Sequence, residues 1–543
     1  MVCNMRHSIL WGGLGALALF FAYAALMLVS PSAWTSPDEA AVAYVAEHGL
    51  MTLAPFGKAL GGLVSPRSLM VVDGSYVPSS WVGLAFALRT LVVLGIPISW
   101  SVLLVPLVAV LGVISWKSIA ARVSGREDVG WIAALLLAVH PGWWHYALRG
   151  LHPNVPFVSL LLCGVWSWMK AFETRRPWML AGTSGVLFGL AVFVRANEAV
   201  WLVPLLAVFL VFAWARASRP VRHTMRIPIA AAVAGFLLPI ILMGAVHEYI
   251  YGSPFSVGYN RASDPIPGLE VNVLGDNASL FSSVVRTLFP FGVHELNTLR
   301  NVWSFHAAFF WPWTILFFFG VGWVFFERRS TTKPLILILY TGAMIALYLL
   351  IEYGSWQFRD NPDPRAITIG TSYIRYWLPI SVWMTLFAAY GVVRAVKEFS
   401  MRTRRYIYAF GGTALVMLST SMVVFSPQEG LVPLLATVEV DQAHRSWVMS
   451  QTNERDLLIV DRSDKYLFPE RSVIVPLRSE QTYASMRLAY DAVQAQGGRL
   501  LYYGLTLPPQ DVEHLNTVRL ASHGLQIQDL STWGDMTLYI VSE

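Results

Sequence analysis

A succession of long apolar runs constrains the fold of this chain more than any other feature. A helix that crosses a bilayer needs about 20 mostly apolar residues, because its backbone polar groups must be satisfied within the hydrocarbon. Only 13% of the 543 residues are charged, against roughly 25% in soluble domains. We therefore expect a polytopic α-helical membrane protein with about 11 spanning helices. The expected spans are residues 8–30, 101–116, 130–146, 155–170, 178–194, 199–214, 227–246, 309–326, 334–351, 373–392 and 406–424.

The Lys and Arg residues fall in short clusters between these runs, as in cytoplasmic loops. The side of the membrane on which these clusters lie depends on whether residues 81–97 cross it. This segment is apolar but is interrupted by Arg89. If it crossed the membrane, Arg122 and Arg126 would lie outside and every later cluster would be inverted. We therefore expect it to lie along or re-enter the outer interface, with the N-terminus cytoplasmic. The formal charge of +6 does not indicate nucleic-acid binding, because no single face carries it.

The composition changes from about Pro427, where short strand-like runs alternate with helical ones. This alternation is typical of a small α/β domain with a largely parallel sheet. We expect residues 1–426 to form the membrane domain, with residues 31–80 as its first outer loop. Residues 427–543 then form an extramembrane α/β domain on the outer side.

Two adjacent carboxylates, Asp38 and Glu39, follow the first apolar run. Ionised groups near hydrocarbon are costly and are usually retained for function. A structural interpretation is equally open on this motif alone. Ser36 suits an N-cap, Pro37 suits the first helical turn, and the helix dipole favours acidic residues there.

Five short motifs carry a family resemblance: SPDEA at 36–40, DGSYVP at 73–78, GLAVFVR at 189–195, YGSPF at 251–255 and IRYWLP at 374–379. In their order along the chain they resemble the GT-C superfamily of glycosyltransferases. The branch they resemble most contains the protein O-mannosyltransferases and the lipid A aminoarabinose transferases. The resemblance implies a polyprenyl-phosphate-linked sugar donor and an active site on the non-cytoplasmic face. It also places Asp38 at the position of the family's catalytic acidic residue.

One carboxylate is enough for this chemistry. A sugar that leaves a phosphate needs no general acid, because the phosphate is already a weak base. Glycosidases need two carboxylates because an alkoxide must be protonated as it leaves. We therefore expect Asp38 to accept the proton of an acceptor hydroxyl in a direct, inverting attack. Glu39, the second member of the catalytic pair, is expected to hydrogen-bond the loop or bias the titration of Asp38.

The donor phosphate requires cations, and the forked donors of Arg suit it. Arg195 and Arg375 rank first, because both lie in the motifs above. Each Arg has an alternative role, in which it extends to lipid headgroups, and Arg195 can form a structural ion pair with Glu198. The full set of candidates is Arg149, Arg195, Arg261, Arg365 and Arg375 at outer helix ends, with Lys58 from the first loop.

Two positions depart from the aminoarabinose-transferase pattern. His152-Pro153-Asn154 stands where that branch has a second acidic residue, and Tyr76-Val77-Pro78 stands where it has a lysine. His152, Asn154 and Tyr76 are therefore candidates for substrate binding, although a solvated loop histidine is the more common outcome. The chain shows no metal-ligand spacing, so we assign no metal site and no cofactor, and a divalent cation that assists the phosphate stays an alternative.

These observations predict a membrane glycosyltransferase that moves a monosaccharide from a polyprenyl-phosphate carrier to an acceptor hydroxyl. The acceptor can be a glycan, a lipid or a protein, and the enzyme contacts membrane lipid. A polytopic transporter of a polar or lipid-linked solute is the first alternative, although the sequence lacks the paired, interrupted halves typical of one. A non-catalytic assembly or lipid-binding protein is the second.

Overall fold

The computed structural model describes residues 2–31, 34–216, 218–258, 263–266, 288–327, 332–358, 366–477 and 481–543, with side chains from residue 12 onward. The chain forms two compact units. Unit 1 contains Met1–Pro31, Val102–Leu242 and Asp276–Leu434. Unit 2 contains Ser32–Ser101, Met243–Gly275 and Leu435–Glu543.

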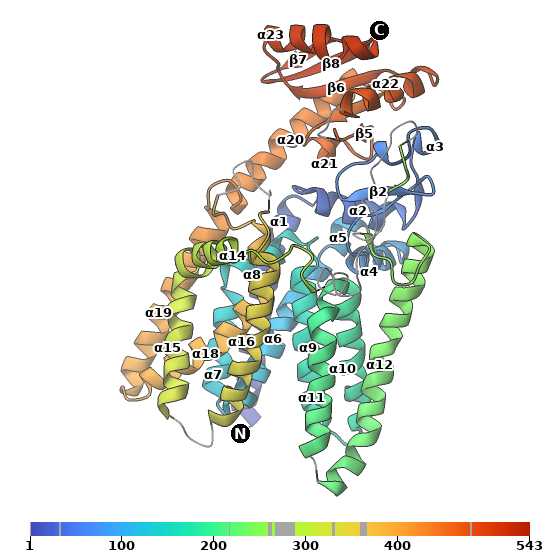
Figure 1. The fold of residues 1–543 in the computed structure, drawn as a ribbon. Coiled ribbons are helices and arrows are strands. Elements are labelled where there is room, and N and C mark those ends of the chain that lie inside the picture. Colours follow the sequence, from blue (N-terminus) through green and yellow to red (C-terminus); the bar gives the residue numbers. More distant parts are fainter. Residues whose placement is uncertain are drawn as a thin grey trace. The chain divides into compact units, whose positions relative to one another are not determined.

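Unit 1 is helical (Figure 1). Its helices are α1 (Val2–Val29), α6 (Leu104–Ser124), α7 (Glu127–Ala138), α8 (Pro141–Arg149), α9 (Asn154–Ala171), α10 (Pro177–Val194), η2 (Ala196–Glu198), α11 (Ala199–Arg216), α14 (Glu295–Val302), η4 (Trp303–Phe309), α15 (Trp311–Glu327), α16 (Lys333–Gly354), α17 (Ser372–Tyr376), α18 (Leu378–Val396) and α19 (Met401–Val424). Two more helices, α12 (Arg219–Tyr251) and α20 (Leu431–Gln451), begin in unit 1 and end in unit 2.

Eight helices of the described chain are long and apolar enough to cross a membrane. A ninth span results if α14 to α15, which bend by 93°, count as one. Together with α7 and α9, these helices occupy the eleven expected runs. The run 130–146 is interrupted between α7 and α8, because His140 adopts an extended conformation before Pro141, as residues before proline tend to do. The expectation of an integral, polytopic helical protein is confirmed.

Close helix contacts in unit 1 rely on glycine. A Cβ on Gly320 of α15 would overlap the carbonyl oxygen of Phe387 in α18. A Cβ on Gly185 of α10 would overlap the carbonyl oxygen of Ala232 in α12. Small residues allow membrane helices to approach closely. This close packing matters because the hydrophobic effect does not drive helices together within lipid. Of the candidate spans, α18 is the most enclosed, with 72% of its apolar window buried.

The segment 81–97 contains α4 (Gly83–Val93), followed by the short α5 (Ile98–Ser101). Helix α4 is about 16 Å long at 1.5 Å per residue, which is too short for a hydrocarbon core of about 30 Å. Its Arg89 Nη1 donates hydrogen bonds to the carbonyl oxygens of Ala46 (3.3 Å) and Glu47 (2.7 Å) at the end of α2. This length agrees with our expectation that residues 81–97 do not cross the membrane.

The first loop contributes a small antiparallel sheet to unit 2. It contains α2 (Pro37–His48), β1 (Thr52–Leu53), α3 (Gly57–Leu60), η1 (Gly61–Leu63), β2 (Leu69–Val72) and β3 (Ser75–Pro78), with strand order β1-β3-β2. The β2–β3 turn places Asp73 and Gly74 at positive φ, as a two-residue hairpin loop requires. The carboxylate of Asp264 accepts the backbone N–H groups of both, at 3.1 and 2.9 Å.

A five-stranded sheet forms the C-terminal part of unit 2. Its elements are β4 (Leu457–Val460), α21 (Asp464–Leu467), β5 (Ser472–Ile474), α22 (Gln481–Gln494), β6 (Leu500–Leu505), α23 (Pro509–His514), η6 (Leu515–Arg519), η7 (Ala521–His523), β7 (Gln526–Trp533) and β8 (Met536–Ser542), with strand order β5-β4-β6-β8-β7. Strands β5, β4 and β6 are parallel, as expected. Strands β8 and β7 are antiparallel, so the expectation of a largely parallel sheet is wrong for them. Only two residues connect β7 to β8, and so short a connection can form only a hairpin.

The first loop and the C-terminal sheet share one core. Leu60, Leu63 and Val64 of the loop pack in the same buried cluster as Leu457 and Tyr539 of the sheet. An ion pair reinforces this packing. The Arg67 guanidinium donates to the buried carboxylate of Asp464 at 2.6 Å, and the Arg67 backbone N–H donates to it at 2.8 Å. Unit 2 therefore comprises the first loop and the C-terminal region together.

Replacing Arg67 by Ala should loosen the first loop, because it leaves the Asp464 carboxylate buried without its cation. We expect a local destabilisation of about 3 kcal/mol, seen as faster hydrogen–deuterium exchange in β2 and β3. The matched control is Arg487→Ala, which removes an Arg whose partners Asp491 and Glu543 are exposed. Unchanged exchange in β2 of the Arg67 variant would contradict this description of unit 2.

Candidate functional site

The acidic pair begins α2, and the structure gives its two members different environments. Glu39 is 1% exposed and completes a capping box with Ser36. Its Oε2 accepts the backbone N–H groups of Thr35 (3.1 Å) and Ser36 (3.0 Å), while Ser36 Oγ accepts the N–H of Glu39 (3.2 Å). This is the reciprocal arrangement that satisfies the first N–H groups of a helix. Glu39 therefore supports the loop, as expected.

Asp38 is half-buried beside Glu39 and is oriented by the other arm of the loop. Ser68 Oγ donates a 2.6 Å hydrogen bond to Asp38 Oδ1. Ser68 has a φ of 65°, a left-handed conformation that few non-glycine residues adopt. Its neighbour Arg67 is the residue that binds Asp464. One short segment thus holds Asp38 on one side and the C-terminal sheet on the other.

Tyr76 and Lys58 lie in the same unit. Tyr76 of β3 is 2% exposed and packs edge-on against Tyr44 of α2 and Phe468, with ring centroids 5.9 and 5.2 Å away. Burial raises the pKa of Tyr76 well above its usual range, and the nearby Tyr44 adds to the rise. Its hydroxyl has no hydrogen-bond partner among the described residues. Lys58 of α3 is exposed.

The other candidates lie in unit 1. Arg195 is 2% exposed at the end of α10. Its Nη2 lies 2.7 Å from Glu198 Oε1 and donates to the Tyr353 hydroxyl at 3.1 Å. The Tyr353 hydroxyl in turn donates to Glu198 at 2.8 Å. The structural ion pair between Arg195 and Glu198 that the sequence allowed is therefore present, and it is buried.

Arg375 of α17 lies beside His152 and Asn154. Its Nη1 donates to His152 Nδ1 at 2.7 Å, and the Asn154 side chain donates to the Arg375 carbonyl at 3.1 Å. His152 is 2% exposed, so the solvated loop histidine is wrong. His152 lies against Arg375, a contact between residues 223 positions apart that no local pattern predicts.

One aromatic ring links the two arginines. The guanidinium carbon of Arg195 lies 4.9 Å from the ring centroid of Tyr376, and that of Arg375 lies 5.1 Å from the same centroid. Tyr353 stacks on Tyr376 at 4.4 Å. Cations are attracted to such a ring face, and one of the two guanidinium groups, that of Arg195, is paired with Glu198. The structure thus brings together Arg195, Arg375, His152 and Asn154.

The remaining candidate cations are Arg149, Arg261 and Arg365. Arg149 is 8% exposed at the end of α8 in unit 1. Arg261 and Arg365 lie outside the described residues. In the part of the chain that the structure describes, no group of three His, Cys, Asp or Glu side chains could hold a metal ion.

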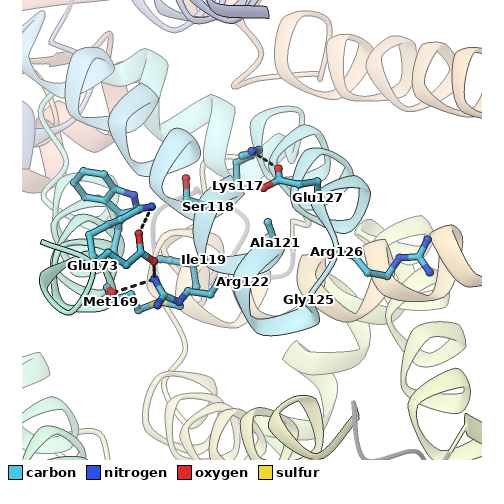
Figure 2. Close-up of a pocket in the computed structure, with 12 residues that line it drawn as sticks. Lys117, Ser118, Ile119, Ala121, Arg122, Gly125, Arg126, Glu127, Met169 and Glu173 are labelled. Carbon is cyan, nitrogen blue, oxygen red and sulfur yellow. Dashed lines mark hydrogen bonds and ion pairs between the residues drawn. The ribbon is translucent and has the colours of Figure 1, made fainter. Parts of the chain in front are cut away.

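Unit 1 also contains a cavity of about 490 Å³ at the ends of α6, α7 and α9 (Figure 2). Most of its charged residues pair with one another: Lys117 with Glu127 at 2.5 Å, Lys170 with Glu173 at 2.7 Å, and Arg122 also with Glu173. Arg126 pairs with Asp128, which lies outside the lining. Arg122 and Arg126 belong to the basic cluster that we expect on the cytoplasmic side. None of the candidate site residues lines this cavity.

Comparison with known proteins bears on the fold and on the class of enzyme. No curated protein matches the chain in sequence. Residues 81–243 match the family of dolichyl-phosphate-mannose-protein mannosyltransferases. This range contains Arg149, His152, Asn154 and Arg195.

Two solved proteins resemble the structure over nearly its whole length. ArnT from Cupriavidus metallidurans, crystallised with bound undecaprenyl phosphate, has a TM-score of 0.55 at 11% sequence identity, and 98% of each chain is covered. The arabinofuranosyltransferase AftD from Mycobacteria has a TM-score of 0.50 at 14% identity, with 98% of this chain and 41% of AftD covered.

The family match and the two likenesses in fold support a GT-C superfamily member. Together they indicate a membrane glycosyltransferase rather than a transporter or a non-catalytic protein. The GT-C fold accounts for the many apolar helices and for the sheet region near the C-terminus.

Sequence reasoning missed Ser68 and Tyr376. Tyr376 adjoins Arg375 in the IRYWLP motif, so an aromatic residue beside a candidate phosphate ligand was a usable signal. Ser68 had none, because it lies thirty residues from Asp38 and a lone serine in a loop is unremarkable.

Replacing Arg195 by Gln should destabilise the GT-C protein by about 3–5 kcal/mol, because it leaves the Glu198 carboxylate buried and unpaired. The double variant Arg195→Gln with Glu198→Gln should recover much of this loss, since neither charge then remains. Thermal unfolding in detergent, followed by tryptophan fluorescence, measures both. If the single variant is as stable as the wild type, the buried ion pair has no structural role.

Proposed function

We propose that this glycosyltransferase moves a monosaccharide from a polyprenyl-phosphate carrier to an acceptor hydroxyl at the non-cytoplasmic face, with inversion. The observation that carries the proposal is the difference in environment between the two residues of the acidic pair. Glu39 is enclosed and used to cap α2, whereas Asp38 is partly exposed and held by Ser68. A transfer from a phosphate needs only one carboxylate, and the pair offers one.

The proposed reaction is a single displacement. The acceptor oxygen attacks the anomeric carbon and the carbon–oxygen bond to the phosphate breaks. The bonding electrons leave with the polyprenyl phosphate, and Asp38 takes the proton of the acceptor hydroxyl. General-base catalysis of this kind contributes about 10²–10⁴ to a rate. The hydrogen bond from Ser68 fixes the orientation of the Asp38 carboxylate.

The basic cluster of unit 1 supports a phosphate-linked donor. Arg375 and Arg195 present two guanidinium groups around Tyr376, and Arg groups bind phosphate with paired donors. Because Arg195 is engaged with Glu198, we assign the main contact with the donor phosphate to Arg375 and a supporting role to Arg195. The bound undecaprenyl phosphate of ArnT supports a polyprenyl carrier as the ligand class.

The proposed face rests on charge. The basic clusters lie between the apolar runs in a pattern that places the N-terminus inside and the C-terminal region outside. Asp38 follows the first span directly, so this orientation places it on the outer side. Nucleotide sugars are absent there, which favours a donor carried on a lipid.

Asp38→Asn should lower sugar transfer by a factor of about 10²–10⁴ while the protein stays folded. Asn can still accept the Ser68 hydrogen bond, but it cannot take a proton. Glu39→Gln is the matched control and should change the rate far less, because Gln also completes a capping box. The measurement is release of polyprenyl phosphate with a radiolabelled donor. Transfer at the wild-type rate by the Asn variant would exclude Asp38 as the base.

Arg375→Ala should weaken donor binding by a factor of about 10–100, the amount that one hydrogen bond to a charged group contributes. The matched control is Arg300→Ala, which removes an exposed Arg of α14. Displacement of a fluorescent polyprenyl phosphate from protein in neutral nanodiscs measures both. Equal affinities for the two variants would remove Arg375 from the donor site.

A further inference from the structure

A pocket of about 610 Å³ lies within unit 2, and nothing in the proposed reaction uses it. One side is formed by Trp34, by the later part of α2 and by Tyr76 of β3. The other side is formed by α20 and by the segment from Lys465 to Ser472 of the C-terminal region. Every lining residue belongs to unit 2.

Aromatic rings dominate the lining. Trp34, Tyr44, Tyr76, Tyr466 and Phe468 all contribute. Three of them form a cluster, in which Tyr44 and Phe468 are 4.6 Å apart between ring centroids. Aromatic rings offer a rigid apolar surface with a polar edge, and the C–H groups of a sugar ring pack well on such a surface.

The polar groups of the lining suit an uncharged ligand. Lys465 pairs with Asp441 at 2.8 Å, and Arg445 pairs with Glu470. Glu47 is a third lining carboxylate, and the lining contains only those two Lys or Arg cations. The pocket thus offers no excess positive charge for a phosphate-bearing headgroup. Its carboxylates and the Gln442 amide can bind hydroxyl groups.

The lining also contains Tyr76, whose hydroxyl is buried and has no hydrogen-bond partner among the described residues. A buried polar group left in this way costs about 1–3 kcal/mol. A ligand hydroxyl that enters the pocket and bonds to Tyr76 would remove this cost.

We infer that this pocket binds a neutral oligosaccharide, so that the acceptor in the proposed reaction is a glycan. The second half of this inference rests on the proposed function. Tyr44 and His48 lie about 9 and 15 Å along α2 from Asp38 at 1.5 Å per residue. The pocket therefore holds sugar units remote from the hydroxyl that reacts.

The first test is glycan binding without donor. Full-length protein in neutral phosphatidylcholine nanodiscs is applied to an array of neutral mannan, glucan, galactan and arabinan oligosaccharides. We expect binding to at least one of them, weakened at least tenfold by Trp34→Ala, by Glu47→Gln and by Tyr76→Phe. The matched controls Trp533→Ala, Glu513→Gln and Tyr490→Phe lie off the pocket and should bind as the wild type does.

Tyr76→Phe separates binding from folding. It keeps the packed ring and removes only the unpaired hydroxyl, so thermal stability should stay equal or rise while glycan affinity falls. Binding by no neutral oligosaccharide, or binding that these variants leave unchanged, would overturn the inference. Preferential binding to vesicles with anionic lipid or to a Ser/Thr-rich peptide, lost in the same variants, would also overturn it.

The second test distinguishes this inference from the proposed function. Trp34→Ala and Glu47→Gln should raise the KM for the glycan acceptor at least tenfold and leave slow donor hydrolysis without acceptor unchanged. If wild-type protein consumes no polyprenyl-phosphate sugar, the proposed function fails and the binding test still stands. If the donor is consumed and the acceptor KM of the variants does not change, the inference of a glycan-binding pocket fails while the proposed function stands.

Discussion

The ion pair between Arg67 and Asp464 is the contact on which the geometry of unit 2 depends. It joins the first loop to the C-terminal sheet across 397 residues, with a carboxylate that is 1% exposed on one side. Ser68 follows directly, in a backbone conformation that is costly for serine. Such a conformation persists only where its surroundings enforce it, and the neighbouring ion pair and the shared core supply that enforcement. The orientation of Asp38 therefore depends on the C-terminal sheet.

A second buried pair organises the basic cluster of unit 1. Arg195 and Glu198 neutralise each other at the end of α10, and Tyr353 bonds to both. The Arg375 guanidinium lies against the same Tyr376 ring as Arg195. A charge beside apolar helices is tolerated when it is paired, which agrees with a structural role for Arg195.

Local patterns in the sequence predicted most of the helical architecture. The apolar runs gave the spans, because the length needed to cross a bilayer is fixed. Ser36 followed by Pro37 predicted the start of α2, while the reciprocal bond from Glu39 that completes the capping box was not predicted. Contacts between distant segments could not be predicted from such local patterns. No residue near His152 in the sequence indicates that Arg375 lies against it, and none near Asp464 indicates that Arg67 binds it. The two-residue connection between β7 and β8, and with it the hairpin, became clear only from the strand ends in the structure.

The separation of Arg67 from Asp464 along the chain has a consequence for biosynthesis. A ribosome that adds 5–20 residues per second needs about 20–80 s to extend the chain from one to the other. During that interval the first span and the loop have left the ribosome, while the partner of Arg67 does not yet exist. Nascent chains that end early would then enter the bilayer with Arg67 unpaired and with the first loop lacking its part of the shared core.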